Sequence, residues 1–224
     1  MRTYPSPPLA IKHQDNSWSG IDISYSKALI DAIGCQYKFV VIPWARALEL
    51  LKSGDIDLMV NVTKSAEREQ HYHFIGPQRY ETIRLVSRVK AFEPIATWQQ
   101  FAALDAVLLR QKGSLFDNKF ENALQHNVGL TERLVQLTTN EINMNLLKKG
   151  RIDGMFIEQF LLDYRIKNDK TIPPIEIHPL VMSRIPVYYA FSKKNYSKQQ
   201  IAKFEQVFNQ LRQSEKFQRL SSQQ

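Results

Sequence analysis

Two distant stretches of the sequence repeat one pattern, and this repeat limits the fold more than any other feature. Residues 51–60 and 147–156 each contain the end of a helical pattern, a glycine that can adopt a left-handed conformation, and a short apolar strand. The glycines are Gly54 and Gly150. The repeat predicts two α/β units of one design, although helix-glycine-strand junctions are common enough for the similarity to arise by chance.

The rest of the chain also alternates between helical and strand patterns. Asp22 is predicted to cap a helix at 23–33, Pro43 to open a helix at 44–53, and Thr138 with Glu141 to open a helix that ends at Gly150. Further helices are predicted at 97–103, 114–126, 159–168 and 197–214, and strands at 37–42, 83–87, 106–109, 134–137, 153–157 and 188–192. This alternation predicts open sheets with helices on both faces.

Composition and charge exclude several classes of protein. Hydrophobic residues make up 43% and charged residues 23% of the 224 residues, which is typical of a globular protein of one or two domains. The single cysteine, Cys35, excludes an intramolecular disulfide and a cysteine-rich metal site. The net charge of +8 is spread along the chain without a nucleic-acid recognition motif. We therefore expect no metal, no cofactor and no nucleic-acid partner.

The first residues of the sequence give information on where the protein is located in the cell. Residues 1–5 lack the apolar core of a secretion signal, and the chain has no apolar run of about 18 residues that would cross a membrane. These observations predict either a cytosolic protein or one from which the signal has been removed.

Polar side chains follow the two repeated strands. Ligands of open α/β sheets bind beyond the carboxyl ends of the strands. That rule singles out Asn61, Thr63 and Arg68 in the first unit and Glu158 in the second. One cationic residue of the protein, Arg68, and one anionic residue, Glu158, are thus both candidates for binding a charged solute.

Five motifs, in this order and spacing, resemble the bacterial extracellular solute-binding proteins that serve polar amino-acid ABC transporters, called family 3. The motifs span nearly the whole chain: Tyr4-Pro-Ser-Pro-Pro-Leu, Gly20-Ile-Asp-Ile, Pro43-Trp-Ala-Arg, the run from Gly54-Asp-Ile-Asp through Thr63-Lys-Ser-Ala-Glu-Arg68, and the run from Gly150-Arg-Ile-Asp through Glu158. The resemblance implies the type 2 periplasmic binding protein fold, an α/β fold in which two lobes, each an open sheet flanked by helices, are joined by two crossing strands. It places lobe 1 at residues 1–88 plus 187–224 and lobe 2 at 89–186, with crossings near 87–92 and 185–187.

The resemblance also implies roles for individual residues. Arg68 falls at the position of the arginine that binds the ligand carboxylate, and a planar guanidinium suits that task. Glu158 falls where amino-acid binders carry an aspartate that pairs with the ligand ammonium group. Arg68 can instead be a surface arginine, and Glu158 can instead cap the helix that follows it.

The other candidates also have two interpretations each. Ser114, expected at a helix start, can hold the ligand carboxylate or serve as an ordinary N-cap. Thr63 can donate its hydroxyl to a ligand or cap a turn. Tyr4 and Trp44 match aromatic positions that sandwich ligands, but Trp44 can equally belong to the core. With Asn61, these residues complete the expected ligand-binding set.

The resemblance favours reversible binding over catalysis. It implies a monomer in the periplasm that captures a small polar solute between closing lobes and delivers it to a membrane ABC permease. We found no metalloprotease motif, phosphate-binding glycine loop or nucleophile elbow, so no catalytic residue is predicted. A ligand-sensing module of a signalling system, or a dehydratase of the same fold, remains an alternative.

Overall fold

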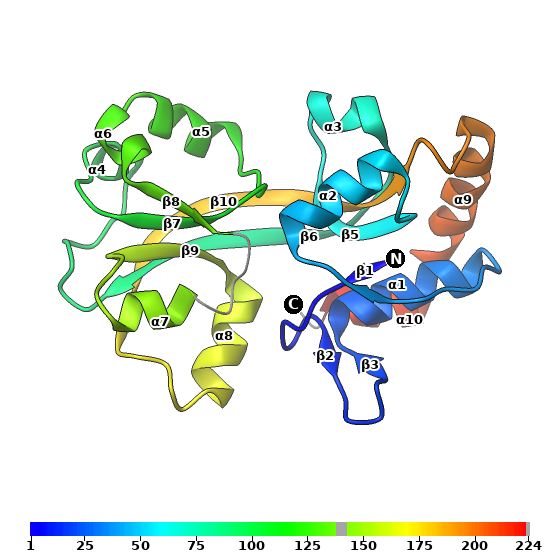
Figure 1. The fold of residues 1–224 in the computed structure, drawn as a ribbon, viewed down its shortest axis with the longest axis horizontal. Helices are drawn as coiled ribbons and strands as arrows, with labels where there is room; N and C mark the ends of the chain where they lie inside the picture. The colour runs from blue at the N-terminus through cyan, green and yellow to red at the C-terminus, as the bar shows by residue number, and fades with distance from the viewer. Residues whose placement is uncertain (138–142, 223–224) are drawn as a thin grey trace. The chain divides into compact units, whose positions relative to one another are not determined.

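The computed structural model describes residues 1–137 and 143–222 of the chain (Figure 1). The chain divides into two compact units, the first made of Met1–Tyr80 and Pro186–Gln224 and the second of Glu81–Ile185. The chain passes from one unit to the other on two long strands, β6 (Tyr72–Arg88) and β10 (Ile175–Ser192). The first passage therefore lies earlier than the expected crossing at 87–92. The lobe boundaries expected from the sequence stay a prediction.

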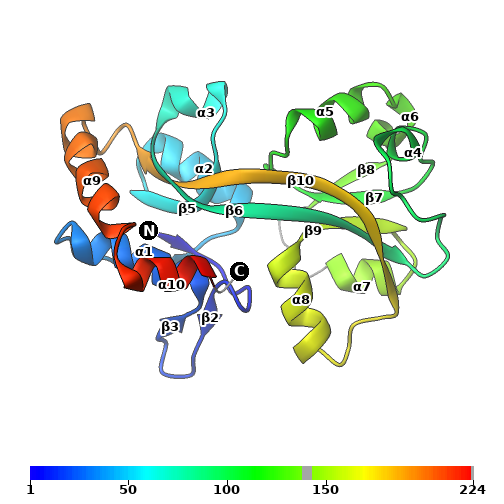
Figure 2. The same ribbon diagram turned by 180° about the vertical axis from the view of Figure 1, so that it is seen from behind.

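The first unit combines an N-terminal α/β segment with the C-terminal helices. Strand β1 (Arg2–Thr3) pairs in parallel with β4 (Val40–Val41), and β5 (Leu58–Thr63) pairs antiparallel with the last part of β10. A small hairpin joins β2 (Ile11–Lys12) to β3 (Trp18–Ser19). The helices of this unit are α1 (Ile21–Ala32), α2 (Trp44–Ser53), α3 (Ala66–His71), α9 (Lys198–Leu211) and α10 (Glu215–Ser222), and α9 and α10 both pack on α1 (Figure 2).

The core of the first unit lies between α2 and β5. Leu48 and Leu51 on α2 are buried against Met59 and Val62 on β5. On the other side of the unit, the fully buried Tyr189 donates its hydroxyl to a main-chain carbonyl of α1. These contacts fix the position of β5, which carries two of the predicted site residues.

The second unit has helices on both faces of its strands (Figure 1). Strand β9 (Gly154–Glu158) pairs antiparallel with β6 and parallel with β7 (Leu108–Gln111), and β7 also pairs parallel with β8 (Leu134–Leu137). One face packs against α4 (Trp98–Ala102), α5 (Asn118–Gln125) and α6 (Val128–Glu132), and the other against α7 (Asn143–Lys148) and α8 (Gln159–Asn168). The predicted open sheet with helices on both faces is confirmed here.

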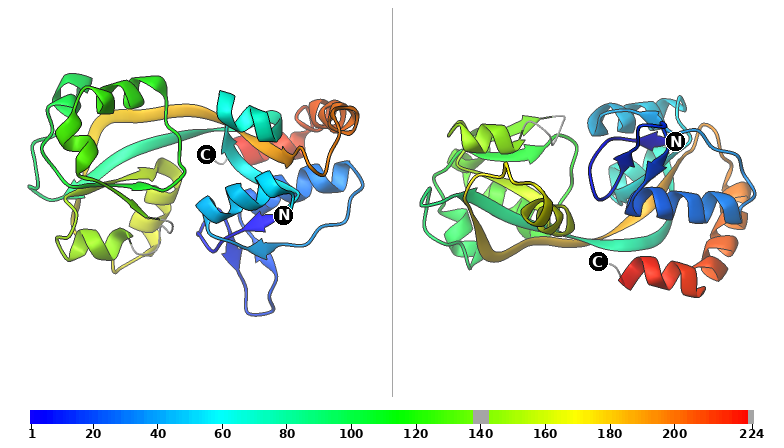
Figure 3. Two further views of the ribbon diagram at one scale, coloured as in Figure 1. Left: turned by 45° about the horizontal axis from the view of Figure 1, so that its top comes forward. Right: turned by 90° about the horizontal axis from the view of Figure 1, so that it is seen from below.

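Apart from the two-stranded pairs β1-β4 and β2-β3, the strands described here form one mixed sheet. Its strand order is β5-β10-β6-β9-β7-β8, so the two strands on which the chain changes units are neighbours (Figure 3). Among the described residues, no helix is long and apolar enough to cross a membrane.

Both repeated segments have the predicted local structure. Gly54 ends α2 with φ of 90°, and Gly150 follows α7 with φ of 65°, so each takes the left-handed conformation before a strand. Helices α2 and α8 and strand β8 have the predicted bounds. The predicted capping box of Thr138 and Glu141 lies outside the described residues.

Other local predictions are wrong. Gly20 rather than Asp22 is the N-cap of α1, and Asp22 lies in the first turn, because the backbone at Gly20 has φ of 117° and the helix starts earlier. The expected buried strand at 37–42 reduces to the two exposed residues of β4. The helix expected to start at Ser114 begins at Asn118, since Asp117 caps it. The helix predicted at 197–214 is present as α9 with Ser197 as its N-cap, and the structure adds α10, which was not predicted.

Candidate functional site

Strand β5 carries two polar residues near its end. Asn61 and Thr63 are half-buried, whereas Val60 and Val62 are buried. The pairing of β5 with β10 is irregular here, because the register shifts between the pairs Met59–Ala190 and Val62–Tyr188. The irregularity places Asn61 and Thr63 at the end of an otherwise buried, apolar strand.

Asn61 is the centre of a polar network in the first unit. Its backbone has φ of 60°, a left-handed conformation that asparagine tolerates better than most residues. Its Oδ1 accepts hydrogen bonds from Arg79 Nε at 3.2 Å and from Gln78 Nε2 at 3.3 Å. Gln78 and Arg79 are themselves buried on β6. The side chain of Asn61 is thus held by protein contacts.

Asp22 adds a buried carboxyl group to this network. Burial raises its pKa, while Arg79, a hydrogen bond from Asn61 and Arg2 each lower it. Within the described part of the chain, its Oδ1 atom is buried and has no hydrogen-bond partner. An unsatisfied buried oxygen is costly and therefore points to a functional role for the cluster.

Arg2 joins the same cluster to two aromatic rings. Its guanidinium carbon lies 5.3 Å from the centre of the Trp44 ring and 5.9 Å from that of Tyr4. Its Nε donates a hydrogen bond to the carbonyl of Ile42 at 3.1 Å. Burial lowers the pKa of Arg2 to about 10, so the side chain stays charged at neutral pH. The rings predicted to sandwich a ligand thus contact a cation of the protein itself.

Arg68 is buried rather than exposed at the surface. It lies on α3 and is 8% exposed, and its Nη1 donates to the carbonyl of Thr63 at 2.9 Å. Burial lowers its pKa, while Tyr72 and Glu67 raise it. Ser65 caps α3 by accepting the backbone N–H of Arg68. The structure therefore brings the predicted pair Arg68 and Thr63 together.

Glu158 has the capping role that was its alternative interpretation. It ends β9, is 9% exposed, and its Oε2 accepts the backbone N–H of Leu161 at 3.1 Å. A carboxylate at the start of α8 also interacts favourably with the helix dipole. A capping carboxylate keeps other lone pairs, so this bond is compatible with a second, ligand-binding role.

Ser114 is not at a helix start, contrary to the prediction. Its Oγ donates to the carbonyl of Gln111 at 2.8 Å and accepts from Arg110 Nε at 3.3 Å. Arg110 also forms an ion pair with Glu121 at 2.5 Å and lies over the ring of Phe116. Ser114 thus stabilises a turn and helps to hold Arg110, and its role in ligand binding stays a prediction.

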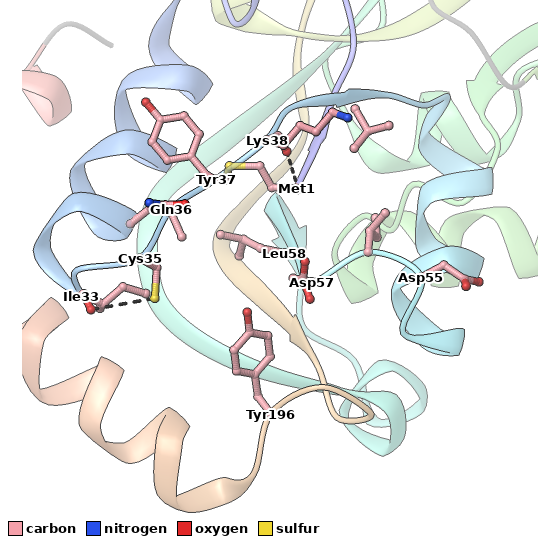
Figure 4. Close-up of a pocket in the computed structure, with 13 residues that line it drawn as sticks. Met1, Ile33, Cys35, Gln36, Tyr37, Lys38, Asp55, Asp57, Leu58 and Tyr196 are labelled. Atoms are coloured by element: carbon pink, nitrogen blue, oxygen red, sulfur yellow. Dashed lines mark hydrogen bonds between the residues drawn. The ribbon is translucent and has the colours of Figure 1, made fainter.

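The first unit also contains a cavity of about 190 Å³ away from these residues (Figure 4). Met1, Cys35, Tyr37, Asp57 and Tyr196 are among the residues that line it, and none of the predicted site residues do. The amino group of Met1 donates to the carbonyl of Lys38 at 2.9 Å. Elsewhere in the described chain, no group of three or more histidine, cysteine or acidic side chains is placed to bind a metal ion.

Comparisons with known proteins identify the family. The sequence profile of the bacterial extracellular solute-binding proteins, family 3, matches residues 2–223, and the chain belongs to this family. A search of curated proteins found no match. The fold is the type 2 periplasmic binding protein fold, as its structural neighbours show.

Three of these neighbours each have a TM-score of 0.80 and cover 99% of this chain. An ancestral arginine-binding protein bound to glutamine is 18% identical, with 94% of its length covered. An ABC uptake transporter substrate-binding protein from Streptococcus pneumoniae with bound histidine is 21% identical, with 89% covered. A histidine kinase sensor domain with similarity to periplasmic binding proteins is 16% identical, with 92% covered.

Sequence reasoning missed Arg2, Gln78 and Arg79. Gln78 and Arg79 follow Gly76-Pro77, a pair that predicts a loop, whereas the structure has a strand there. Arg2 lies beside the aromatic Tyr4 near the start of the chain, and no pattern signals that its side chain reaches Trp44. These positions depend on tertiary contacts, which local patterns do not report.

Proposed function

We propose that this solute-binding protein captures a small polar solute with a carboxylate group, an amino acid or a related zwitterion, and delivers it to an ABC permease in the periplasm. The observation that carries the proposal is the burial of Arg68 beside the end of β5. A guanidinium held inside the protein can bind a ligand carboxylate through charge-assisted hydrogen bonds, which are stronger than neutral ones. The neighbours with bound glutamine and histidine support an amino-acid ligand.

Glu158 completes the proposal as the partner of the ligand ammonium group. Its carboxylate is held in place by its bond to Leu161, so it is already ordered before a ligand arrives. Tyr4, Trp44, Asn61, Thr63 and Ser114 stay candidates for further contacts with the solute.

Arg68→Ala tests the carboxylate site. Removing one partner of a desolvated charge pair costs about 2 to 5 kcal/mol, or roughly 30-fold to several thousand-fold in affinity. We expect a thermal-shift screen of amino acids and small organic acids to identify a ligand, and calorimetry to show this loss in the variant. Lys52→Ala is the matched control, because it removes a positive charge from an exposed position of the same unit. Equal ligand affinity for Arg68→Ala and the parent protein would overturn the assignment.

Glu158→Gln separates the charge of Glu158 from its capping bond. The glutamine oxygen can still accept the N–H of Leu161, so helix α8 keeps its cap. We expect amino acids to lose affinity far more than simple carboxylates in this variant. An equal loss of affinity for amino acids and for simple carboxylates would show that Glu158 does not bind the ammonium group.

The sensor-domain neighbour favours a second candidate, a ligand-sensing module. The two functions differ in their partner. We expect the loaded protein to stimulate ATP hydrolysis by a reconstituted amino-acid permease, whereas a sensing module would leave that rate unchanged. Conversion of an aromatic amino-acid precursor, measured in the same preparation, would instead support the dehydratase alternative.

A further inference from the structure

We propose that Arg2 binds a second carboxylate of the solute, so that the preferred ligands are acidic amino acids or dicarboxylates. This inference rests on the proposed function, because it assigns the first carboxylate to Arg68. It concerns the substrate class and a specificity-determining residue, and all the residues that carry it belong to the first unit.

The side chain of Arg2 is held by its surroundings. The rings of Tyr4 and Trp44 both lie within cation-π distance of its guanidinium, at 5.9 and 5.3 Å. The bond from its Nε to the carbonyl of Ile42 sets the rotation of the planar group. An ordered guanidinium loses little conformational entropy when it binds a carboxylate.

The guanidinium of Arg2 also carries hydrogen-bond donors that are not used within the described residues. Apart from the bond of its Nε, Arg2 makes no hydrogen bond within the described residues, so its two Nη groups donate to no described protein atom. The residue as a whole is half-buried. Two Nη groups at one edge of a guanidinium match the two oxygens of a carboxylate.

The local charge favours an anion and disfavours a cation. Arg2 and Arg79 place two guanidinium groups around the single carboxyl group of Asp22. Because Arg2 already interacts with the aromatic rings and with Asp22, a cationic ligand side chain would have to displace it. Ligands such as arginine are therefore expected to bind poorly.

The two proposed carboxylate sites are connected through one strand. Asn61 belongs to the cluster that contains Asp22 and Arg79, and Thr63 accepts a hydrogen bond from Arg68. Asn61 and Thr63 are two residues apart, which corresponds to about 7 Å of extended chain. A small solute with a carboxylate at each end is the kind of ligand that two such cations can bind together.

Arg2→Met tests this inference, because methionine keeps an unbranched apolar stem and removes the guanidinium. Calorimetric titrations use L-glutamate, L-glutamine, succinate and L-arginine with both proteins. We expect the parent to prefer L-glutamate to L-glutamine, and the variant to lose about 10- to 100-fold in affinity for L-glutamate, with little change for L-glutamine. L-arginine is expected to gain affinity in the variant, since the rings and Asp22 become available to a ligand cation.

Two further variants keep the result unambiguous. Lys52→Met removes an exposed positive charge and is expected to leave the glutamate-to-glutamine affinity ratio unchanged. Arg2→Lys keeps the charge without the paired donors and is expected to restore part of the glutamate affinity; it also serves if Arg2→Met fails to fold.

The outcomes distinguish this inference from the proposed function. A neutral or cationic amino acid that binds the parent more tightly than L-glutamate, in an Arg68-dependent manner, would overturn the inference alone. An unchanged glutamate-to-glutamine ratio in Arg2→Met would do the same. If no small carboxylate or amino acid binds the parent at all, both the inference and the proposed function are wrong.

Discussion

His178 in the second unit is fully buried, and its surroundings hold it in the neutral state. Its Nδ1 accepts the backbone N–H of Ile95 at 3.0 Å, so the proton of the neutral ring belongs on Nε2, which lies 3.0 Å from Ser87 Oγ. Ser87 Oγ in turn donates to the carbonyl of Arg88, and Phe92 stacks on the imidazole at 4.8 Å. Burial lowers the pKa of His178, and the charge of Glu176 raises it.

These contacts predict acid sensitivity. A histidine whose pKa is lower in the folded protein than the ordinary 6.5 contributes stability that is present above pH 6.5 and is lost as the pH falls through the folded-state pKa. We expect urea unfolding of the parent to show a falling free energy of unfolding between pH 7 and 5, by at most about 1.4 kcal/mol per pH unit from this group.

His178→Gln provides the comparison, because an amide can replace both hydrogen bonds without titrating. The variant is expected to be less stable than the parent at pH 7 but to lose less stability on acidification. His73, whose pKa is also lowered by burial, titrates equally in both proteins and cancels in the difference. Parallel pH profiles for the two proteins would show that His178 does not contribute.

Single residues show where sequence reasoning succeeds and where it fails. Arg68 and Thr63 were predicted from a motif and do lie together, because the motif places both around the end of one strand. The prediction that Ser114 starts a helix was wrong, because Asp117 is the residue that caps α5. Arg2 could not be identified as a site residue from the sequence, since its contacts with Trp44 depend on the pairing of β1 with β4.

At the scale of elements, the two repeated junctions have the same local design but different surroundings. The repeated aspartates both accept hydrogen bonds that tie each turn to its unit: Asp57 from Asn195 Nδ2, and Asp153 from the backbone of Val107 and from Arg88. Asn195 also donates to the carbonyl of Gly54. The repeated aspartate therefore has a structural role in both units.

The glycines of these junctions form a matched pair for mutation. A Cβ atom on Gly54 would lie 2.7 Å from Asn195 Oδ1 and 2.9 Å from Lys194 Cβ, whereas one on Gly150 would meet nothing within 4 Å. Both positions carry the cost of the left-handed conformation, about 1 to 2 kcal/mol. We expect Gly150→Ala to lose about that much stability in urea unfolding.

Gly54→Ala should lose more, about 2 to 4 kcal/mol, because the new methyl group also displaces Asn195 from its hydrogen bonds. The ratio of the two losses is the informative quantity, since both proteins carry the same substitution. Equal losses would show that the turn at Gly54 adjusts freely around the added atom.

Whole helices and strands were predicted accurately where the sequence marks their ends clearly. Helix α8 has both a capping residue and a clear end, and its predicted bounds are confirmed. Strand β4 was overpredicted because the run from Tyr37 to Ile42 is apolar except for Lys38, yet Val40 and Val41 are 40% and 50% exposed. An apolar run indicates a strand only where tertiary contacts bury it, and here they do not.

At the scale of the whole molecule, the α/β alternation and the motif order predicted the fold class, which the family match and the structural neighbours confirm. The residues at which the chain changes units carry no comparable sequence pattern. Strands β6 and β10 continue through the passages at 80–81 and 185–186 without a change of secondary structure, so no local signal marks these points.

The division of the chain also predicts which unit can fold without the other. A chain ended after Ile185 contains every residue of the second unit but lacks the part of β10 that pairs with β5. We expect limited proteolysis of this fragment to spare residues 81–185 and to digest residues 1–80. Equal survival of both parts would contradict the prediction.

The pairing of Thr63 with Val187 has a consequence for the order of events during synthesis. Residues 1–80 leave the ribosome before residues 81–185, yet β5 receives its partner strand, and α1 its covering helices, only when residues 186–222 emerge. The second unit is continuous in sequence and has all its residues before that point. Of the two units, the one whose synthesis starts earlier is therefore completed later.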